Sequence, residues 1–299
     1  MSVPRADREP RLGAHMSIAG GMALSVSRAL AVQATALQVF VKSANQWKAR
    51  AFAAGEVDEF RRAAAAAGLA RHTLAHASYL VNLASPDDAL WQRSIEALRE
   101  EKERCACLAI PYLVVHPGAH MGSGTEAGLV RVIQALTRVL DGEHARRRAT
   151  AGESVTILLE ITAGAGTTLG ASFEEIAFIV ERVERNELLG VCFDTCHALA
   201  AGHEFRDSSS YRATLRALDR SLGIERIRAF HLNDSRSAFG SRVDRHAHIG
   251  HGEVGLEAFR LILNDPRFRG IPMVLETPKG EDLAEDRANL NVLRSLVKR

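Results

Sequence analysis

Six residues that can bind a divalent metal recur along this chain at nearly regular intervals. They are His76, His116, Glu160, Asp194, His231 and Glu276, and 34 to 45 residues separate each from the next. Each directly follows a short apolar run that is typical of a buried β-strand. A lone histidine or carboxylate in such a position is more often structural. Six of them gathered together would be costly to desolvate without a cation, so the repetition predicts a metal centre.

Three further residues complete the predicted set of metal ligands. Asp244 and His246 stand two residues apart, so their side chains lie on the same side of an extended segment. His197 follows Asp194 by one helical turn and cannot easily share its metal, so we expect it to join Asp244 and His246. Five histidines and four carboxylates are too many for one tetrahedral zinc and suit three metal sites. This mixed ligation favours zinc, with manganese or iron as alternatives in part of the sites.

The elements that must position these ligands alternate between strand-like and helix-like patterns. The strand-like runs are residues 12–16, 36–41, 73–75, 112–115, 155–159, 191–193, 227–230 and 272–275. Helical periodicity lies between them, as in Val130, Ile133 and Leu140, and the loop 17–21 can cap the first helix. Strands alternating with helices imply βαβ units and a parallel sheet.

About eight such units predict an α/β fold with a single (β/α)8 TIM barrel, whose strands converge with their C-terminal ends on one face. A doubly wound open sheet is the alternative, but no Gly-rich dinucleotide turn follows the first strand. We expect residues 1–10 to form a flexible leader and residues 11–299 to form one catalytic barrel domain.

Composition narrows the class of protein. The 299 residues are 46% hydrophobic and 25% charged with a formal net charge of +2, which is typical of a globular protein; this charge neither demands nor excludes a nucleic-acid partner, and any basic binding surface must be local. Neither a membrane-spanning run nor a signal peptide is present, so we expect a cytoplasmic protein without a membrane partner. The four cysteines have spacings that suit neither a disulfide framework nor a zinc finger, and we expect buried free thiols.

The segments around the predicted ligands resemble the endonuclease IV family of apurinic/apyrimidinic endonucleases. The resemblance spans Gly13 to Pro278 and rests on HASYLVNL (residues 76–83), HPGAH (116–120), LEITAGAG (159–166), GVCFDTCH (190–197), HLNDS (231–235) and SRVDRHAHIGHG (241–252). It implies a TIM barrel with three zinc ions per chain that acts in DNA repair on double-stranded DNA containing abasic sites. No protein partner is expected.

The resemblance also implies roles for individual residues. One zinc would be held by His76, His116 and Glu160, with Glu160 as the catalytic residue that bridges to the second zinc. The second zinc would be completed by Asp194, His231 and Glu276, and the third would be held by His197, Asp244 and His246. One departure is Ile161, which replaces a small polar residue often found after the bridging glutamate and could change a hydrogen bond near the metals.

Three residues are expected to contact DNA. Tyr79 stands three residues after a ligand and could wedge into a bent duplex, with packing inside its loop as an equally weighted alternative. Arg245 should point away from the metals and could reach a phosphate, or could be an ordinary solvated arginine. Gln46 lies in the loop 44–47, which lacks the arginine that some family members place before this glutamine.

The expected reaction is hydrolysis of the phosphodiester 5′ to an abasic deoxyribose, which leaves a 3′-hydroxyl and a 5′-deoxyribose phosphate. Divalent cations would attract the phosphodiester, stabilise the charge of its transition state and supply hydroxide near neutral pH. An abasic nucleotide has no base to unstack, so turning it outward costs least. A divalent-metal sugar isomerase of the same barrel architecture is the alternative; it typically needs two ions, which the third trio of ligands argues against. A non-catalytic metal-binding protein would be expected to close its coordination shells.

Overall fold

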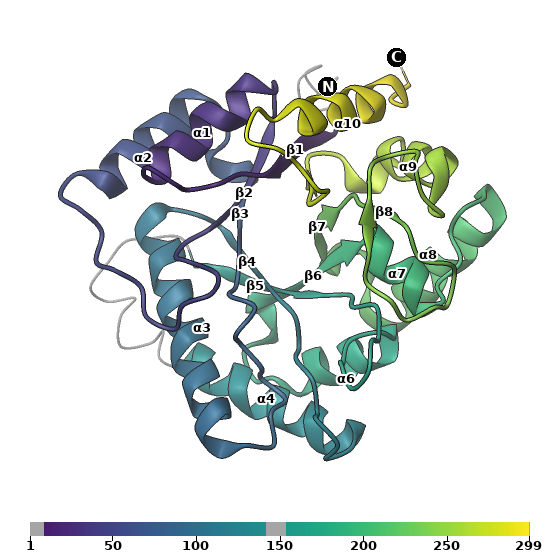
Figure 1. The fold of residues 1–299 in the computed structure, drawn as a ribbon. Helices are drawn as coiled ribbons and strands as arrows, with labels where there is room; N and C mark the ends of the chain where they lie inside the picture. Colours follow the sequence, from purple (N-terminus) through teal and green to yellow (C-terminus); the bar gives the residue numbers. More distant parts are fainter. Residues whose placement is uncertain (1–8, 142–153, 299) are drawn as a thin grey trace, which may run out of the picture.

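Eight parallel strands close into a barrel in the computed structural model, which describes residues 9–141 and 154–298 (Figure 1). The predicted TIM barrel is therefore confirmed. Its neighbouring strands follow the order β1, β10, β7, β6, β5, β4, β3 and β2. Their bounds are β1 Arg11–His15, β2 Ala36–Phe40, β3 Thr73–His76, β4 Tyr112–Val115, β5 Thr156–Glu160, β6 Leu189–Asp194, β7 Ile227–His231 and β10 Pro272–Leu275.

Helices surround this barrel on the outside (Figure 1). Within the described residues they are α1 Met22–Ala31, α2 Glu56–Ala66, α3 Asp88–Leu108, α4 Thr125–Asp141, α6 Phe173–Arg182, α7 Thr195–Ala201, α8 Ser208–Leu222, α9 Gly255–Leu263 and α10 Ala284–Ser295. Short 3-10 turns precede four strands: η2 Ala70–His72, η3 Asn186–Leu188, η4 Ile224–Arg226 and η5 Pro266–Phe268. A small antiparallel ribbon, β8 Asp234–Ser235 and β9 His246–Ala247, stands beside the barrel.

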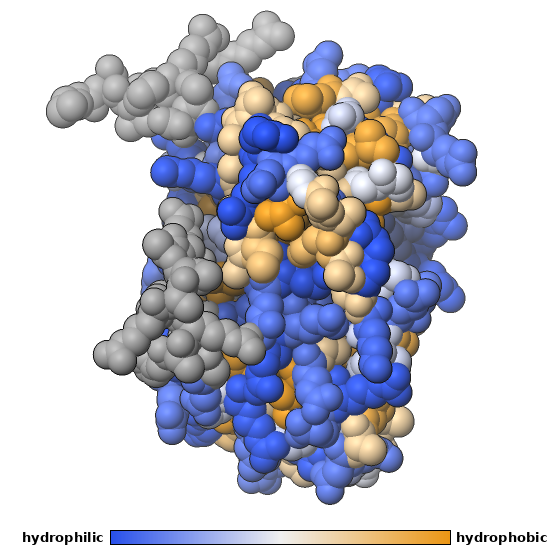
Figure 2. All heavy atoms as spheres, turned by 90° about the vertical axis from the view of Figure 1, so that its left-hand side faces the viewer, coloured by the Kyte–Doolittle hydropathy of each residue, from blue (hydrophilic) through white to orange (hydrophobic). Residues whose placement is uncertain are grey.

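The described helices and the surface that they form bear on whether the chain spans a membrane. None of the helices in residues 9–141 and 154–298 is long and apolar enough to cross a bilayer. On the side where α2 and α3 lie, polar side chains cover most of the surface and apolar ones gather in its upper half (Figure 2).

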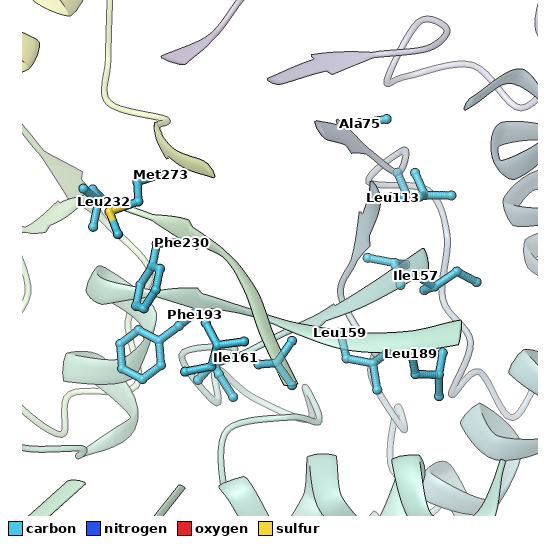
Figure 3. Packing of buried hydrophobic residues seen from close by; sticks show 14 of the residues in the cluster. Ala75, Leu113, Ile157, Leu159, Ile161, Leu189, Phe193, Phe230, Leu232 and Met273 are labelled. Atoms are coloured by element: carbon cyan, nitrogen blue, oxygen red, sulfur yellow. The ribbon is translucent and has the colours of Figure 1, made fainter. Parts of the chain in front are cut away.

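The core has two layers, one inside the barrel and one between the barrel wall and the surrounding helices. Inside the barrel, one apolar layer is formed by Ala36, Leu74, Val114, Leu158, Cys192, Ala229 and Val274, one from each of seven strands. The next residues along the strands point the other way, as Phe193 and Phe230 do where they pack outside β6 and β7 with ring centroids 5.7 Å apart (Figure 3). Burial of each such aromatic side chain contributes roughly 1.5–3 kcal/mol.

The eighth strand contributes Gly13 at the level of the inner layer. Gly13 is the register partner of both Ala36 on β2 and Val274 on β10. A Cβ at this position would lie 1.9 Å from the carbonyl oxygen of Ala36. The glycine therefore lets β1 and β2 approach closely, which brings the residues that follow on the two strands side by side.

Several local expectations are corrected. The first strand begins one residue earlier than predicted, and His76, Glu160, Asp194 and His231 end their strands instead of following them. The loop 17–21 does cap α1, but through Gly21 and without a side-chain hydrogen bond, while the Ser17 hydroxyl accepts from the Ala19 amide. Of the predicted leader, residues 1–8 lie outside the described residues.

Two expectations about buried residues are also wrong in part. On α4 the buried face includes Leu129, Val132 and Leu136, whereas Val130 is exposed. All four cysteines are free, but Cys107 is exposed, because it stands two residues after the buried Cys105 on α3 and therefore on another face of the helix.

Candidate metal centre

A ring of polar side chains lies directly above the inner apolar layer. Because side chains alternate with period two, the residue two places beyond each inward apolar residue also points into the barrel. These positions hold His15, Gln38, His76, His116, Glu160, Asp194, His231 and Glu276. The structure thus brings all six strand-end residues together at the C-terminal mouth.

Glu160 occupies the centre of the ring and is completely buried. Its Oε2 lies 3.1 Å from His76 Nε2 and 3.0 Å from His116 Nε2. Its Oε1 lies 3.1 Å from His197 Nδ1 and 3.1 Å from His231 Nδ1. The two oxygens of one carboxylate therefore face two different pairs of histidines.

Two groups of ligand atoms share this carboxylate. The first comprises His76, His116 and Glu160, and the second comprises Glu160, Asp194, His231 and Glu276; within each group the ligand atoms lie within 4.8 Å of one another. The His116 side chain is 38% exposed. The first group is thus the more open to an incoming substrate.

The third trio lies beside this pair of groups. His197 Nε2 is 3.2 Å from Asp244 Oδ2, and His246 Nε2 is 3.4 Å from Asp244 Oδ1. Asp194, however, also lies within reach, since ligand atoms of Asp194, His197 and His246 come within 4.8 Å of one another. Asp194 and His197, which we expected to bind different metals, lie close together because Asp194 is the N-cap of α7 and accepts from the His197 amide.

Hydrogen bonds fix the orientation of four of the histidine rings. Backbone carbonyl oxygens can only accept, so His76, His197 and His246 donate from Nδ1 to the carbonyls of Ala77, Ile161 and Glu276, respectively. In each ring this leaves Nε2 as the nitrogen that can bind a metal. His231 has the opposite arrangement, with Nε2 on the side chain of Gln38 and Nδ1 toward the carboxylates.

Charges in the ring stabilise the ionised form of the carboxylates and the positive form of the histidines that face them. Burial alone would raise the pKa of Glu160, but His231, His116 and His197 hold it well below its usual range. Burial would lower the pKa of His231, yet Cys192, Glu276 and Glu160 raise it well above its ordinary value. The carboxylates thus require nearby positive charge, which divalent cations supply.

One buried atom supports the fit to a cation. Among the described residues, His246 Nε2 has no hydrogen-bond partner although it is buried. An unsatisfied buried polar group costs about 1–3 kcal/mol. Its nearest carboxylates are Asp244 and Asp194, at 3.4 and 3.8 Å, so a cation among these three residues would satisfy it. The donor set of imidazoles and carboxylates is also the one that zinc, manganese and iron accept.

Three residues that shape the ring were not predicted. Gln38 and His15 contact Glu276 and each other. Asn233 donates to Asp194 Oδ2 and accepts from the Glu276 amide. The available signal for Gln38 and His15 was their place two residues beyond Ala36 and Gly13, which are inward positions.

The residues expected to contact DNA lie at the barrel mouth or on exposed loops. Tyr79 is 66% exposed, and its ring rests against Phe40 and His76 with centroids 5.5 and 5.9 Å away. Gln46 and Arg245 are exposed.

Ile161 contacts the ring through its backbone. Its side chain is buried in the outer apolar layer near Phe193 (Figure 3), while its carbonyl accepts from His197. The contact to His197 therefore belongs to the backbone, and the side chain at this position has no part in it.

Comparison with known proteins identifies related chains. Residues 26–296 match a family described as a xylose isomerase-like TIM barrel. A probable endonuclease 4 from Chloroflexus aggregans is 53% identical over 289 residues, which cover 97% of this chain and 98% of the relative. The crystal structure of endonuclease IV from Thermus thermophilus matches with a TM-score of 0.82 and 40% identity, covering 96% of this chain and 98% of that one. A D-tagatose 3-epimerase-like protein has a TM-score of 0.67 at 17% identity over 95% of this chain and 98% of that one, which is a likeness of fold alone.

Proposed function

This chain belongs to the endonuclease IV family of nucleases, and from that membership and the ring of ligands we propose that it cleaves double-stranded DNA at abasic sites. The proposed reaction is hydrolysis of the phosphodiester 5′ to the abasic site, leaving a 3′-hydroxyl and a 5′-deoxyribose phosphate. The protein would act in DNA repair in the cytoplasm, with residues 11–299 as one catalytic domain. The observation that carries the proposal is Glu160, whose two oxygens face different pairs of histidines at 3.0–3.1 Å.

The proposed cofactor is three zinc ions per chain. The first site would use His76, His116 and Glu160, and the second Glu160, Asp194, His231 and Glu276. The third would use His197, Asp244 and His246, with Asp194 close enough to share between the second and third sites. When bound, the cations would attract the phosphodiester, activate water and stabilise the charge of the transition state.

The chain's own residues would hold this arrangement rigid. The carbonyls of Ala77, Ile161 and Glu276 fix three rings by accepting their Nδ1 protons, so little reorganisation is needed when the substrate arrives. Glu160 would bridge the first two sites because it offers one oxygen to each. The inner apolar layer closes the floor of the site and excludes water from below.

Residues around the mouth would handle the DNA. The Tyr79 ring is exposed above His76 and could pack into the gap that an abasic nucleotide leaves when it turns outward. Arg245 is exposed between two ligands of the third site and could meet a phosphate. Gln46 is exposed in the loop after β2 and could contact the same duplex.

A divalent-metal sugar isomerase of the same barrel architecture is the second candidate, because the matched family is described as a xylose isomerase-like TIM barrel. Two observations argue against it. The third trio adds ligands beyond those of the first two sites, and His246 carries a buried nitrogen that fits a further cation.

Two measurements on the purified protein test the proposal together. A duplex with a single abasic site should be nicked on its 5′ side, while the same duplex without the lesion should stay intact. Protein never exposed to a chelator should contain close to three metal ions per chain. One ion or none would remove the trinuclear centre, and epimerisation of a ketohexose without nicking would favour the sugar isomerase.

A further inference from the structure

Gln38 contacts three other members of the ring at once. Its side chain is completely buried at the mouth of β2. The amide nitrogen Nε2 lies 2.6 Å from Glu276 Oε1 and 3.0 Å from His15 Nδ1, and the amide oxygen Oε1 lies 2.8 Å from His231 Nε2. The neutral side chain thus links two of the proposed ligands of the second metal.

The direction of these hydrogen bonds follows from what each group can do. A carboxylate only accepts, so Gln38 must turn its NH2 group toward Glu276 and its oxygen toward His231. His231 must then donate from Nε2, which leaves a lone pair on Nδ1. That nitrogen faces Glu276 Oε2 at 3.2 Å, Glu160 Oε1 at 3.1 Å and Asp194 Oδ2 at 3.8 Å.

His15 keeps the amide in this orientation. It is the register partner of Gln38 on the adjacent strand, brought close because Gly13 permits the approach of β1 to β2. Its Nδ1 accepts the second amide proton. A flipped amide would leave that nitrogen without a donor and would place two oxygens, on Gln38 and Glu276, against each other.

We propose that Gln38 is a positioning residue for the second metal site, where it sets the tautomer of His231 and orients the carboxylate of Glu276, with His15 holding its amide. The proposal rests on the proposed function, because it takes Glu160, Asp194, His231 and Glu276 to be a metal site. Residues that orient metal ligands in this way typically change metal affinity by about 10–100-fold when they are replaced.

Zinc titration of variants tests this role. Gln38→Met keeps the length of the side chain but loses all three polar contacts, to Glu276, His15 and His231. At a buffered free zinc concentration that just fills the wild type, we expect Gln38→Met to bind two ions instead of three and to need about 10–100-fold more free zinc for the third. Gln134→Met, on the exposed side of α4, is the matched control and should bind three ions like the wild type.

A second variant and a spectroscopic readout separate positioning from folding. Gln38→Glu keeps an acceptor for His231 Nε2 but sets a second carboxylate against Glu276, so it should also bind the third ion more weakly. Nitrogen NMR of the protein saturated with zinc should show a proton on His231 Nε2 in the wild type, held in the hydrogen bond to Gln38, and should show that proton exchanging faster with solvent in Gln38→Met. Circular dichroism with the wild-type shape would show that both variants are folded.

The outcomes distinguish this inference from the proposed function. Three ions bound by Gln38→Met at the wild-type zinc concentration, or an unchanged signal of the His231 Nε2 proton, would overturn the role of Gln38 and leave the metal centre standing. A wild-type protein that binds one ion or none would remove the metal centre, and the inference with it.

Discussion

Residues of the ring either are proposed metal ligands or position those ligands. The residue type predicts the first role much better than the second. The nine proposed ligands could be predicted, because each is a histidine or carboxylate and most stand where a strand ends. The inward position of Gln38 could be predicted too, but its role could not, because glutamine is not a typical metal ligand and its partners His231 and Glu276 lie 193 and 238 positions away in the sequence. The same holds for Asn233, whose contacts with Asp194 and Glu276 arise only when three strands meet.

Replacing the central carboxylate should separate chemistry from binding. In Glu160→Gln the amide keeps the shape but offers only one oxygen, so it cannot bridge two cations well. We expect cleavage of abasic DNA to fall by orders of magnitude while binding of that DNA largely survives. Single-turnover nicking and a binding titration measure the two effects, with the exposed Glu174→Gln on α6 as the control. Near-normal turnover of the variant would mean that Glu160 does not bridge.

Removing the exposed ring of Tyr79 should weaken lesion recognition. If the ring packs into the duplex at the abasic site, Tyr79→Ala should lose about 1–3 kcal/mol of binding to abasic DNA and less to intact DNA. Tyr79→Phe should retain most of the discrimination, and metal content should stay unchanged in both variants. Titrations at one fixed salt concentration make the comparison, because phosphate contacts vary with ionic strength. Equal losses on both duplexes would indicate a backbone contact, and no loss would assign the ring to loop packing.

Among the secondary-structure elements, α3 holds two mouth loops in place. Lys42, after β2, and Glu101, on α3, form a buried ion pair at 3.1 Å. Lys42 also donates to the carbonyl of Trp47, and Glu101 accepts from the amide of Ser78. The loops that carry Gln46 and Tyr79 are therefore tied to the same helix and to each other.

Breaking this pair should destabilise the protein strongly. Lys42→Met leaves the Glu101 carboxylate buried without its partner, which typically costs about 3–5 kcal/mol of unfolding free energy. The double variant Lys42→Met/Glu101→Leu should recover a large part of that loss, because no charge is left buried. Denaturant titration of the two variants gives the values, with Glu257→Gln on the surface of α9 as a control that should change little. A double variant no more stable than the single one would show that the pair matters for packing and not for charge.

The spacing of apolar residues in the sequence predicts the bounds of some strands well and the buried face of α4 poorly. The strands at residues 112–115 and 272–275 have the predicted bounds, because their apolar runs are enclosed on both faces. The face of α4 was misassigned, since its apolar residues cover more than half of the helix circumference and the pattern alone does not show which of them meets the barrel. Only the packing of α4 against α3 and α6 decides this.

For the whole molecule, the repeated βα pattern sufficed to predict the barrel, and the closure of β1 on β10 joins the two ends of the described chain. The proposed ions would connect strands that are far apart in the sequence, such as β3 with β5 and β5 with β10. Their binding energy would then contribute to the stability of the whole fold.

Chelation should accordingly lower the temperature of unfolding. A ligand that binds only the folded state adds about 2.7 kcal/mol when its free concentration is 100 times its dissociation constant. Scanning calorimetry before and after treatment with a chelator should show a clear fall in the unfolding temperature, and added zinc should restore it. An unchanged unfolding temperature, after metal analysis has shown that the ions were removed, would contradict the coupling of metal binding to stability.

On each strand, the residue in the polar ring follows the residue in the inner layer by two positions. A metal site is therefore complete only when every strand that supplies a ligand is paired in the correct register. If one strand slipped by a single residue during folding, its ring residue would turn outward toward the helices and an outer apolar residue would enter the mouth. A misfolded barrel could still be compact, but it would lack a ligand. If three ions bind each correctly folded chain, the number of ions bound after refolding from denaturant would report the fraction of chains whose strands all have the correct register. A measurement of overall compactness could not give this fraction.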